Sequence, residues 1–185
     1  WDFGPVKALG FHTRLVGWID KSRLRAGSRA LDLGCAVGRI SLELTRVCES
    51  VVGIDYSTTF IESARKIRES GLVTFQLTRE GALGTSAQVR NPAAVVLDRV
   101  SVCQGDAEYL SESLGIFDVI IMANLLERVA HPRKVLSRLS DITQPGAQVI
   151  ICSPFTWWDE FTEPEERLGG FIQDGKELTS MDTVA

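Results

Sequence analysis

The chain has 185 residues, 44% of them hydrophobic, which is the size and composition of one folded domain over residues 1–185. Its 20 Lys and Arg residues against 24 Asp and Glu residues give a net charge of −4, so no broad basic surface is available for a nucleic-acid partner. No apolar run reaches the roughly 20 residues that span a bilayer, and the N-terminus lacks the layout of a signal peptide. We therefore expect a cytoplasmic protein with no membrane partner.

The first half of the chain predicts strands that alternate with helices. Apolar residues recur at helical spacing in Val6, Leu9, Leu15, Val16 and Ile19, which predicts an N-terminal helix. Beyond it the pattern predicts a strand over Arg29 to Leu33, a helix over Gly38 to Cys48, a strand over Ser50 to Asp55, and a helix over Ser57 to Ser70 that Gly71 ends. Such an alternation predicts a doubly wound α/β fold with a mostly parallel sheet.

The second half continues the pattern after an interruption. Residues 72–92 show no clear periodicity, and we interpret them as an insertion before the third strand. Strands are predicted over 100–104 and 117–122, with 108–114 between them, and a fifth strand over 147–153. A helix over 132–140 precedes that fifth strand, and Pro145-Gly146 predicts the turn between them.

The four cysteines are widely spaced and form no C-x-x-C pair: Cys35, Cys48, Cys103 and Cys152. This spacing favours neither a zinc site nor a small disulfide scaffold, and it fits a reducing cytoplasm. We expect no metal site.

A glycine-containing turn follows the first predicted strand in the segment LDLGCAVGR, residues 31–39. The small residues Gly34, Ala36 and Gly38 let the backbone approach a ligand closely, and Asp32 at the strand end is placed to accept from a cationic or hydroxylated ligand. A dinucleotide site would favour the spacing G-x-G-x-x-G, which is absent. A NAD-dependent oxidoreductase is therefore the least favoured alternative.

Two further acidic residues follow the next predicted strands. Asp55 closes the second strand about 20 residues past the glycine turn, where an acid can accept hydrogen bonds from both hydroxyls of a ribose. The alternative role is a helix N-cap, for which Ser57 is the more natural residue. Asp106 follows the third strand in the segment QGDA, where a single loop aspartate is usually a turn former. The ordered series of turn and acids predicts a nucleotide pocket.

The segments that follow the fourth and fifth strands are candidates for binding a second substrate. Residues 123–128, ANLLER, lie at the carboxyl edge of the predicted sheet, where ligands bind in open α/β folds. Residues 153–162, SPFTWWDEFT, are dense in aromatic and acidic side chains, which suit a small cationic or heteroaromatic ligand. A hydrophobic lid or a partner-docking patch is an equal alternative for this second segment.

The glycine turn and its acids resemble the first motifs of class I S-adenosyl-L-methionine (SAM) methyltransferases, with Ala36 in place of the middle glycine of the family. One branch is similar over nearly the whole chain: the methyltransferase domain fused to, or working with, the sulfoxide synthase of ovothiol biosynthesis. Its likeness rests on ALDLGCAVGRISLELTR, VVGIDYSTTFIESAR, QGDAEYL, FDVIIMANLLERVAHP and SPFTWWDEFTEPEERLGGF, the last being the most specific. The N/D-P-P-Y/F tetrapeptide of DNA amino methylases is absent after the fourth strand.

The resemblance implies a Rossmann-like class I methyltransferase fold and methyl transfer from SAM to an imidazole nitrogen of 5-thiohistidine, which yields ovothiol A and S-adenosyl-L-homocysteine (SAH). The cofactor-binding residues that it implies are Asp32, Gly34, Cys35, Ala36, Gly38, Asp55, Tyr56, Phe60, Asp106, Ala107 and Asn124. The candidates for holding the substrate or assisting catalysis are Asn124, Glu127, Trp157, Asp159 and Glu160, the last three within a substrate segment over 153–170.

Little acid–base chemistry is needed for such a reaction. A neutral imidazole nitrogen is already nucleophilic, so the enzyme chiefly aligns it with the methyl group and excludes water. The two histidines are His12 and His131, and we interpret His131, which precedes Pro132, as a helix-entry residue rather than a catalytic one.

The resembled fold adds two further strands after the fifth, which end in an antiparallel hairpin at the sheet edge, and they are missing here. A polar stretch and a helix start over Thr179 to Ala185 stand in their place. With Trp1 as the first residue, we expect the native chain to be longer. The alternative functions are methyl transfer to another small amine, thiol or carboxylate, and a catalytically silent domain that docks on a synthase partner through Trp157-Trp158.

Overall fold

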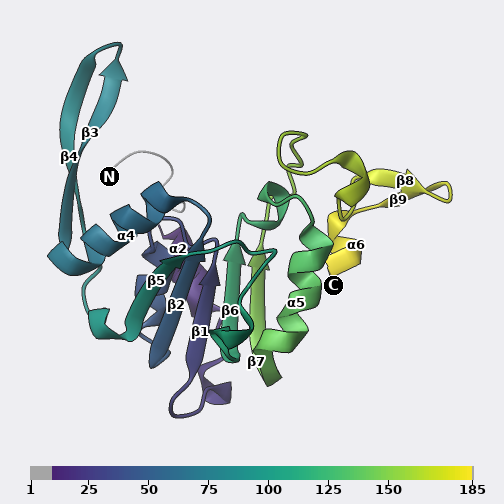
Figure 1. Ribbon diagram of the computed structural model, residues 1–185, viewed down its shortest axis with the longest axis horizontal. Helices are drawn as coiled ribbons and strands as arrows, with labels where there is room; N and C mark the ends of the chain where they lie inside the picture. The colour runs from purple at the N-terminus through teal and green to yellow at the C-terminus, as the bar shows by residue number, and fades with distance from the viewer. Residues whose placement is uncertain (1–9, 185) are drawn as a thin grey trace.

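A computed structural model describes residues 10–184, which form a five-stranded parallel sheet with helices on both faces (Figure 1). The strand order is β5-β2-β1-β6-β7, so the chain builds outward from β1 on one side and then crosses over to the other. The predicted doubly wound α/β fold is confirmed. The strands are β1 (Arg29–Leu33), β2 (Ser50–Asp55), β5 (Val100–Gln104), β6 (Phe117–Ala123) and β7 (Thr143–Cys152).

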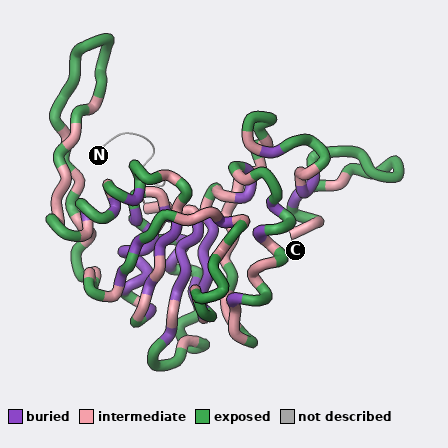
Figure 2. Tube along the Cα trace, viewed as in Figure 1, coloured by how far each residue is buried: buried purple, intermediate pink, exposed green. Residues whose placement is uncertain are grey.

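The strands are buried on both faces because alternate side chains enter two separate cores. In β6, Val119 and Ile121 point into the core beneath α2 (Phe11–Gly17), α3 (Arg39–Leu44) and α4 (Thr58–Ser70). Ile120 and Met122 point into the opposite core, which α5 (Pro132–Ile142) covers. The buried strands run through the middle of the molecule in Figure 2. The near-continuous apolar strands of the sequence therefore reflect burial by both helical layers.

Short 3-10 helices connect several of these elements. They are η1 (Lys21–Arg23), η2 (Leu97–Arg99), η3 (Glu112–Leu114), η4 (Leu126–Arg128) and η5 (Pro164–Glu166). Because η4 directly follows β6, it begins at the carboxyl edge of the sheet, where it bears on the site described below.

Two predicted boundaries were wrong. Helix α3 ends at Leu44 instead of Cys48, because the Thr45 hydroxyl donates to the Leu42 carbonyl at 2.7 Å and the chain leaves the helix in turns. Strand β7 begins at Thr143, and Pro145-Gly146 forms a register irregularity inside it instead of the turn before it. Proline donates no ladder hydrogen bond and Gly146 has φ +83°, so this pair bulges from the strand.

The insertion over residues 72–92 is an antiparallel hairpin of β3 (Leu72–Glu80) and β4 (Leu83–Arg90). It extends away from the sheet and is exposed along its outer part (Figures 1 and 2). At its base Val73 pairs with Val89, and both pack against the core under α4. The alternation of Val73, Phe75 and Leu77 was a signal for a strand that the sequence reading missed.

The last part of the chain forms a second small hairpin, β8 (Phe171–Gln173) with β9 (Lys176–Leu178), followed by α6 (Ser180–Val184). The predicted helix near Thr179 is confirmed within the described residues. The hairpin is a separate two-stranded sheet, so within residues 10–184 β7 remains the edge strand of the main sheet. At the other end, Val6 and Leu9 of the predicted N-terminal helix lie outside the described residues, while Leu15 and Val16 are buried in α2. None of the described helices is long and apolar enough to cross a membrane.

Candidate functional site

A cavity of about 790 Å³ lies at the carboxyl edge of the sheet, next to the point where the strand order reverses between β1 and β6. Ligands bind at this point in open α/β folds, because the loops diverge there. The predicted site residues on its wall are Gly34, Cys35, Ala36, Asp55, Tyr56, Phe60, Asp106, Ala107 and Asn124. The strand-end series that the sequence predicted is thus brought to one place.

The glycine turn between β1 and α3 forms the floor of this cavity. The N–H groups of Gly34 and Cys35 both donate to the Ile54 carbonyl, at 2.8 and 2.9 Å, which ties the turn to β2. Gly34 has φ +78°, and a Cβ there would come within 3.0 Å of the Leu125 side chain. Ala36, at the place of the missing glycine, also adopts a positive φ of 46°. The turn therefore keeps a conformation that favours glycine although alanine occupies its middle.

Asp55 ends β2 with its carboxylate on the cavity wall. One of its oxygens accepts from the Ala36 N–H at 2.8 Å and the other from the Ser57 N–H at 2.9 Å. Each carboxylate oxygen can accept a second bond, so the group retains capacity for two ligand hydroxyls. The two backbone bonds hold it in position, while Ser57 caps α4 through its own side chain, as predicted.

Asp106 and Ala107 follow β5 on the same wall. The Asp106 carboxylate accepts from the Glu108 N–H at 2.8 Å, and Ala107 is nearly buried. Glu108 is in turn bound by His131, whose N–H donates at 3.0 Å and whose ring Nδ1 lies 2.7 Å from the carboxylate. Burial alone would raise the pKa of Glu108, but these bonds hold it below its ordinary value. His131 stands at the N-cap position of α5, where the sequence placed it as a helix-entry residue.

Two aromatic side chains and one thiol complete the predicted cofactor wall. Tyr56 and Phe60, at the end of β2 and on the first turn of α4, line the cavity and are exposed. Burial raises the pKa of the Cys35 thiol, which is therefore an uncharged group at physiological pH. Together they offer apolar contact surface to a ring.

Two residues of the predicted cofactor set do not line the cavity. Asp32 is 1% exposed and accepts from the Ser41 hydroxyl at 2.6 Å, while its second oxygen is buried with no hydrogen-bond partner. Burial raises the pKa of Asp32 to about 7. Gly38 is the N-cap of α3 with φ +81°. Both lie beneath the turn, where they support its shape instead of facing the space that a ligand would fill.

Among the predicted substrate residues, only Asn124 lines the cavity. It follows β6 with φ +55°, and its N–H donates to the Cys152 carbonyl at 2.7 Å. Glu127 does not line the cavity: it is 3% exposed and accepts from the Ser153 hydroxyl at 2.6 Å. This places Glu127 between η4 and the start of the aromatic segment.

The aromatic segment contributes to the cavity through a residue that was not predicted. Trp157 donates to the Ser180 hydroxyl at 3.0 Å and packs toward α6, Asp159 pairs with Arg167, and Glu160 is exposed. None of these three lines the cavity. Phe161 does, because the Thr162 hydroxyl donates to the Val129 carbonyl at 2.7 Å and ties the segment to η4.

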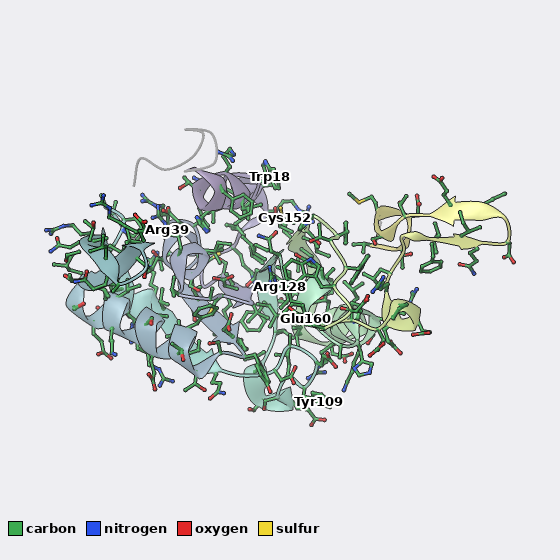
Figure 3. All side chains as sticks on the ribbon, turned by 90° about the horizontal axis from the view of Figure 1, so that it is seen from above. Trp18, Arg39, Tyr109, Arg128, Cys152 and Glu160 are labelled. Atoms are coloured by element: carbon green, nitrogen blue, oxygen red, sulfur yellow. The ribbon has the colours of Figure 1, made fainter. Side chains whose placement is uncertain are left out.

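Further lining residues that the predicted site set lacks include Phe11 and His12 from α2, Arg39 from α3 and Arg128 from η4. Figure 3 looks onto this edge of the sheet and shows Arg39 and Arg128 at separate places along it. Burial, with a smaller effect of Arg39, lowers the pKa of His12 against an opposing effect of Glu43, so its imidazole is neutral at physiological pH. Arg39 immediately follows the glycine turn, and Arg128 ends the candidate segment ANLLER, so both had a usable signal, whereas α2 carries no motif.

No group of three or more His, Cys, Asp or Glu side chains within residues 10–184 is placed to hold a metal ion. The chemistry that this cavity offers is instead that of hydrogen-bonding carboxylates, close backbone and aromatic walls, with arginines at two places along the edge.

Comparisons with known proteins agree with this geometry. A family model described as a methyltransferase domain matches residues 7–177. The ubiquinone biosynthesis O-methyltransferase of Burkholderia ambifaria strain MC40-6 is 30% identical over 150 residues, which cover 80% of this chain and 53% of that protein. The enzyme of the same name from Pseudomonas aeruginosa strain LESB58 is 29% identical over 138 residues, 74% of this chain and 48% of the relative. The chain thus spans about half the length of the curated relatives it matches.

Solved structures of low identity share the fold. The YcgJ protein of Bacillus subtilis has a TM-score of 0.55 at 19% identity, over 76% of this chain and 50% of that one. A glycopeptide N-methyltransferase, MtfA, solved with SAM has a TM-score of 0.51 at 18% identity, over 78% of this chain and 52% of that one. These likenesses bear on the architecture alone.

Proposed function

This chain belongs to the methyltransferase domain family, and on that basis we propose that the protein transfers the methyl group of SAM to a small molecule. The observation that carries the proposal is the cavity at the switch point, which joins the glycine turn, Asp55 and Asp106 on one wall. An uninterrupted space of about 790 Å³ is large enough for a cofactor and a small acceptor together.

The donors and acceptors present fit SAM. Asp55 is held by two backbone bonds with capacity left for the ribose hydroxyls, and Asp106 with the Ala107 backbone is suited to the adenine. Gly34 holds the turn at φ +78°, and a Cβ there would press on the Leu125 side chain, so glycine lets the turn pack closely against the loop after β6. When bound, SAM supplies an activated methyl group on a sulfonium, and SAH is the product. The protein's task is then to bind and align the acceptor and to exclude water.

For the acceptor we propose an imidazole nitrogen of 5-thiohistidine, with ovothiol A as the product. The support is the likeness of the segment after β7 to the thiohistidine methyltransferase branch, together with a cavity wall to which that segment contributes Phe161. The nitrogen lone pair forms the new bond to the methyl carbon as the carbon–sulfur bond breaks, and the other ring nitrogen then loses its proton to water. Asn124 and Phe161 are the residues suited to orient the ring; assisting roles for Glu127, Trp157, Asp159 and Glu160 would act from outside the cavity wall.

A second candidate acceptor is a hydroxyl group on another small molecule. The named relatives are O-methyltransferases, and this observation favours oxygen as the acceptor atom. A third proposal concerns partners: a fused or associated sulfoxide synthase domain would dock on the exposed Trp158, which is 53% accessible.

Calorimetry with SAH tests the cofactor part of this proposal. Wild-type protein should bind SAH, and Asp55→Ala should weaken binding at least about tenfold, because charge-assisted bonds to the ribose are lost. Asp98→Asn, an exposed acid on η2, is the matched control and should bind like wild type. A wild-type protein that does not bind SAH, or an Asp55→Ala variant that binds equally well, would contradict the proposal.

A methyl-transfer assay tests the acceptor. Tritiated SAM is incubated with 5-thiohistidine and, separately, with small amines, thiols, carboxylic acids and catechols. The proposal expects label in 5-thiohistidine on a ring nitrogen. Transfer to a hydroxyl compound alone would favour the second candidate, and binding of SAH with no transfer to any acceptor would favour a docking domain.

A further inference from the structure

Arg128 is a cationic side chain on the cavity wall whose charge the protein itself leaves unmatched. It ends η4, four residues after Asn124, and lines the cavity from the β6 side. Its backbone N–H donates to the Leu125 carbonyl at 2.8 Å, which closes the 3-10 turn. Within residues 10–184, its guanidinium makes neither an ion pair nor a hydrogen bond. All five of its N–H groups are therefore open to a ligand or to water.

The other charged side chains on this wall already have protein partners. Arg39 donates to Glu43 from two nitrogens, at 3.2 and 2.8 Å, and Glu108 is bound by His131. Asp55 and Asp106 accept from backbone N–H groups on the side of β2 and β5. The cavity wall thus carries acids after β2 and β5, where the cofactor is proposed, and one unmatched cation on η4.

Two aromatic rings lie beside the guanidinium. The Arg128 Cζ lies 5.8 Å from the Trp158 ring centre and 5.6 Å from the Phe161 ring centre, and the two rings are 6.2 Å apart. Their segment is anchored by the buried Thr162, which donates to the Val129 carbonyl next to Arg128. Contact with ring faces restricts an arginine while its N–H edge stays available, so the planar fork is preorganised for a planar anion.

We propose that Arg128 binds a carboxylate group of the methyl acceptor. The inference rests on the proposed function and adds to it that the acceptor is a small carboxylic acid, such as the amino acid 5-thiohistidine. A carboxylate matches the guanidinium fork with two parallel bonds, which neither an amine nor a neutral ring could do. SAM also carries a carboxylate, and the Kd for SAH separates the two cases, because an Arg128 that bound the cofactor would be needed for SAH binding.

Binding of matched acceptor pairs to the protein–SAH complex tests the proposal without turnover. The first pair is 5-thiohistidine and its decarboxylated counterpart, 5-thiohistamine. The second is 3,4-dihydroxybenzoate and catechol, a hydroxyl acceptor with and without the same group. In wild type, we expect the carboxylated member of a pair to bind at least about tenfold more tightly, which is the effect of a charged hydrogen-bonded pair.

The variant Arg128→Gln should remove that preference and leave the Kd for SAH within about twofold of wild type. Arg128→Lys should restore only part of it, because an ammonium cannot make the bidentate pair. Arg133→Gln, an exposed arginine on α5 that does not line the cavity, is the charge-matched control and should keep the full preference.

Each other outcome contradicts either the carboxylate-binding role of Arg128 or only the choice of 5-thiohistidine as the acceptor. If Arg128→Gln weakens SAH binding tenfold, the carboxylate belongs to the cofactor and the inference is overturned. It is overturned too if no carboxylated compound binds the wild-type complex, or if Arg128→Gln weakens the binding of both members of a pair by the same factor. If the preference and its dependence on Arg128 appear only with 3,4-dihydroxybenzoate, the inference stands and 5-thiohistidine is excluded as the acceptor.

Discussion

At the residue scale, the buried Asp32 beneath the glycine turn should make the stability of the folded protein depend on pH. Burial raises its pKa to about 7 from 3.8, so the folded state holds a proton that the unfolded chain releases near pH 4. Its contribution to stability is therefore full below pH 4 and is lost as the pH rises to 7. We expect Asp32→Asn, which cannot titrate, to gain up to about 4 kcal/mol of unfolding free energy relative to wild type between pH 4 and pH 8, because each pKa unit corresponds to about 1.4 kcal/mol.

Urea unfolding of both proteins at several pH values between 4 and 8 measures this difference. Asparagine keeps an oxygen that can accept from Ser41, so the bond that holds α3 to β1 is retained. Asp98→Asn, on the exposed η2, should show a difference from wild type that does not vary with pH in this way. A pH-independent gap between Asp32→Asn and wild type would show that Asp32 is ionised in the folded protein.

At the element scale, α4 links the site to the core through its first turn. Ser57 accepts from the Phe60 N–H at 3.3 Å and begins the helix, Gly71 ends it with φ +69°, and Ile61 is buried against the sheet. Ser57→Ala should lower the unfolding free energy by about 1 kcal/mol, because an N–H group of the first turn loses its acceptor. Urea denaturation is the measurement. Thr58→Ala, one residue later and exposed, is the control; equal losses in both variants would mean that the cap contributes nothing.

At the scale of the whole molecule, the β3–β4 hairpin is an appendage to the sheet and supplies no residue to the described cavity wall (Figure 1). Its ends meet where the Asn91 N–H donates to the Gly71 carbonyl, and Val73 pairs with Val89 at the base. Replacing residues 74–88 by Asn-Gly, a two-residue hairpin turn, should leave the Kd for SAH within about twofold of wild type.

Calorimetry on the shortened protein measures this, with thermal unfolding as the check that it is folded. The base is retained, so the valines still cover the core under α4. A folded shortened protein that binds SAH tenfold more weakly would mean that the hairpin reaches the cofactor or holds α4 in place.

The sequence predicted the sheet and the strand-end residues of the site well. Strands and helices leave local periodicities, and Gly34, Asp55 and Asp106 are found by their place at strand ends. The β3–β4 hairpin was missed because its apolar alternation is short, running from Val73 to Leu77, and most of its residues are exposed. The predicted end of α3 and the predicted start of β7 were wrong, because one hydroxyl hydrogen bond and one β-bulge determine these boundaries.

Chain order alone determined that an acid follows β2, that another follows β5, and that a parallel sheet brings both to its carboxyl edge. Only the tertiary structure decided which side chains face the cavity. Asp32 and Glu127 look like ligand-binding acids in the sequence, yet packing buries both against serine hydroxyls. Arg128 ends the candidate segment ANLLER, but its ring partners come from a segment some 30 residues later, which brings two rings to 5.8 and 5.6 Å from its Cζ. Contacts of that kind depend on how distant parts of the chain pack rather than on any local pattern.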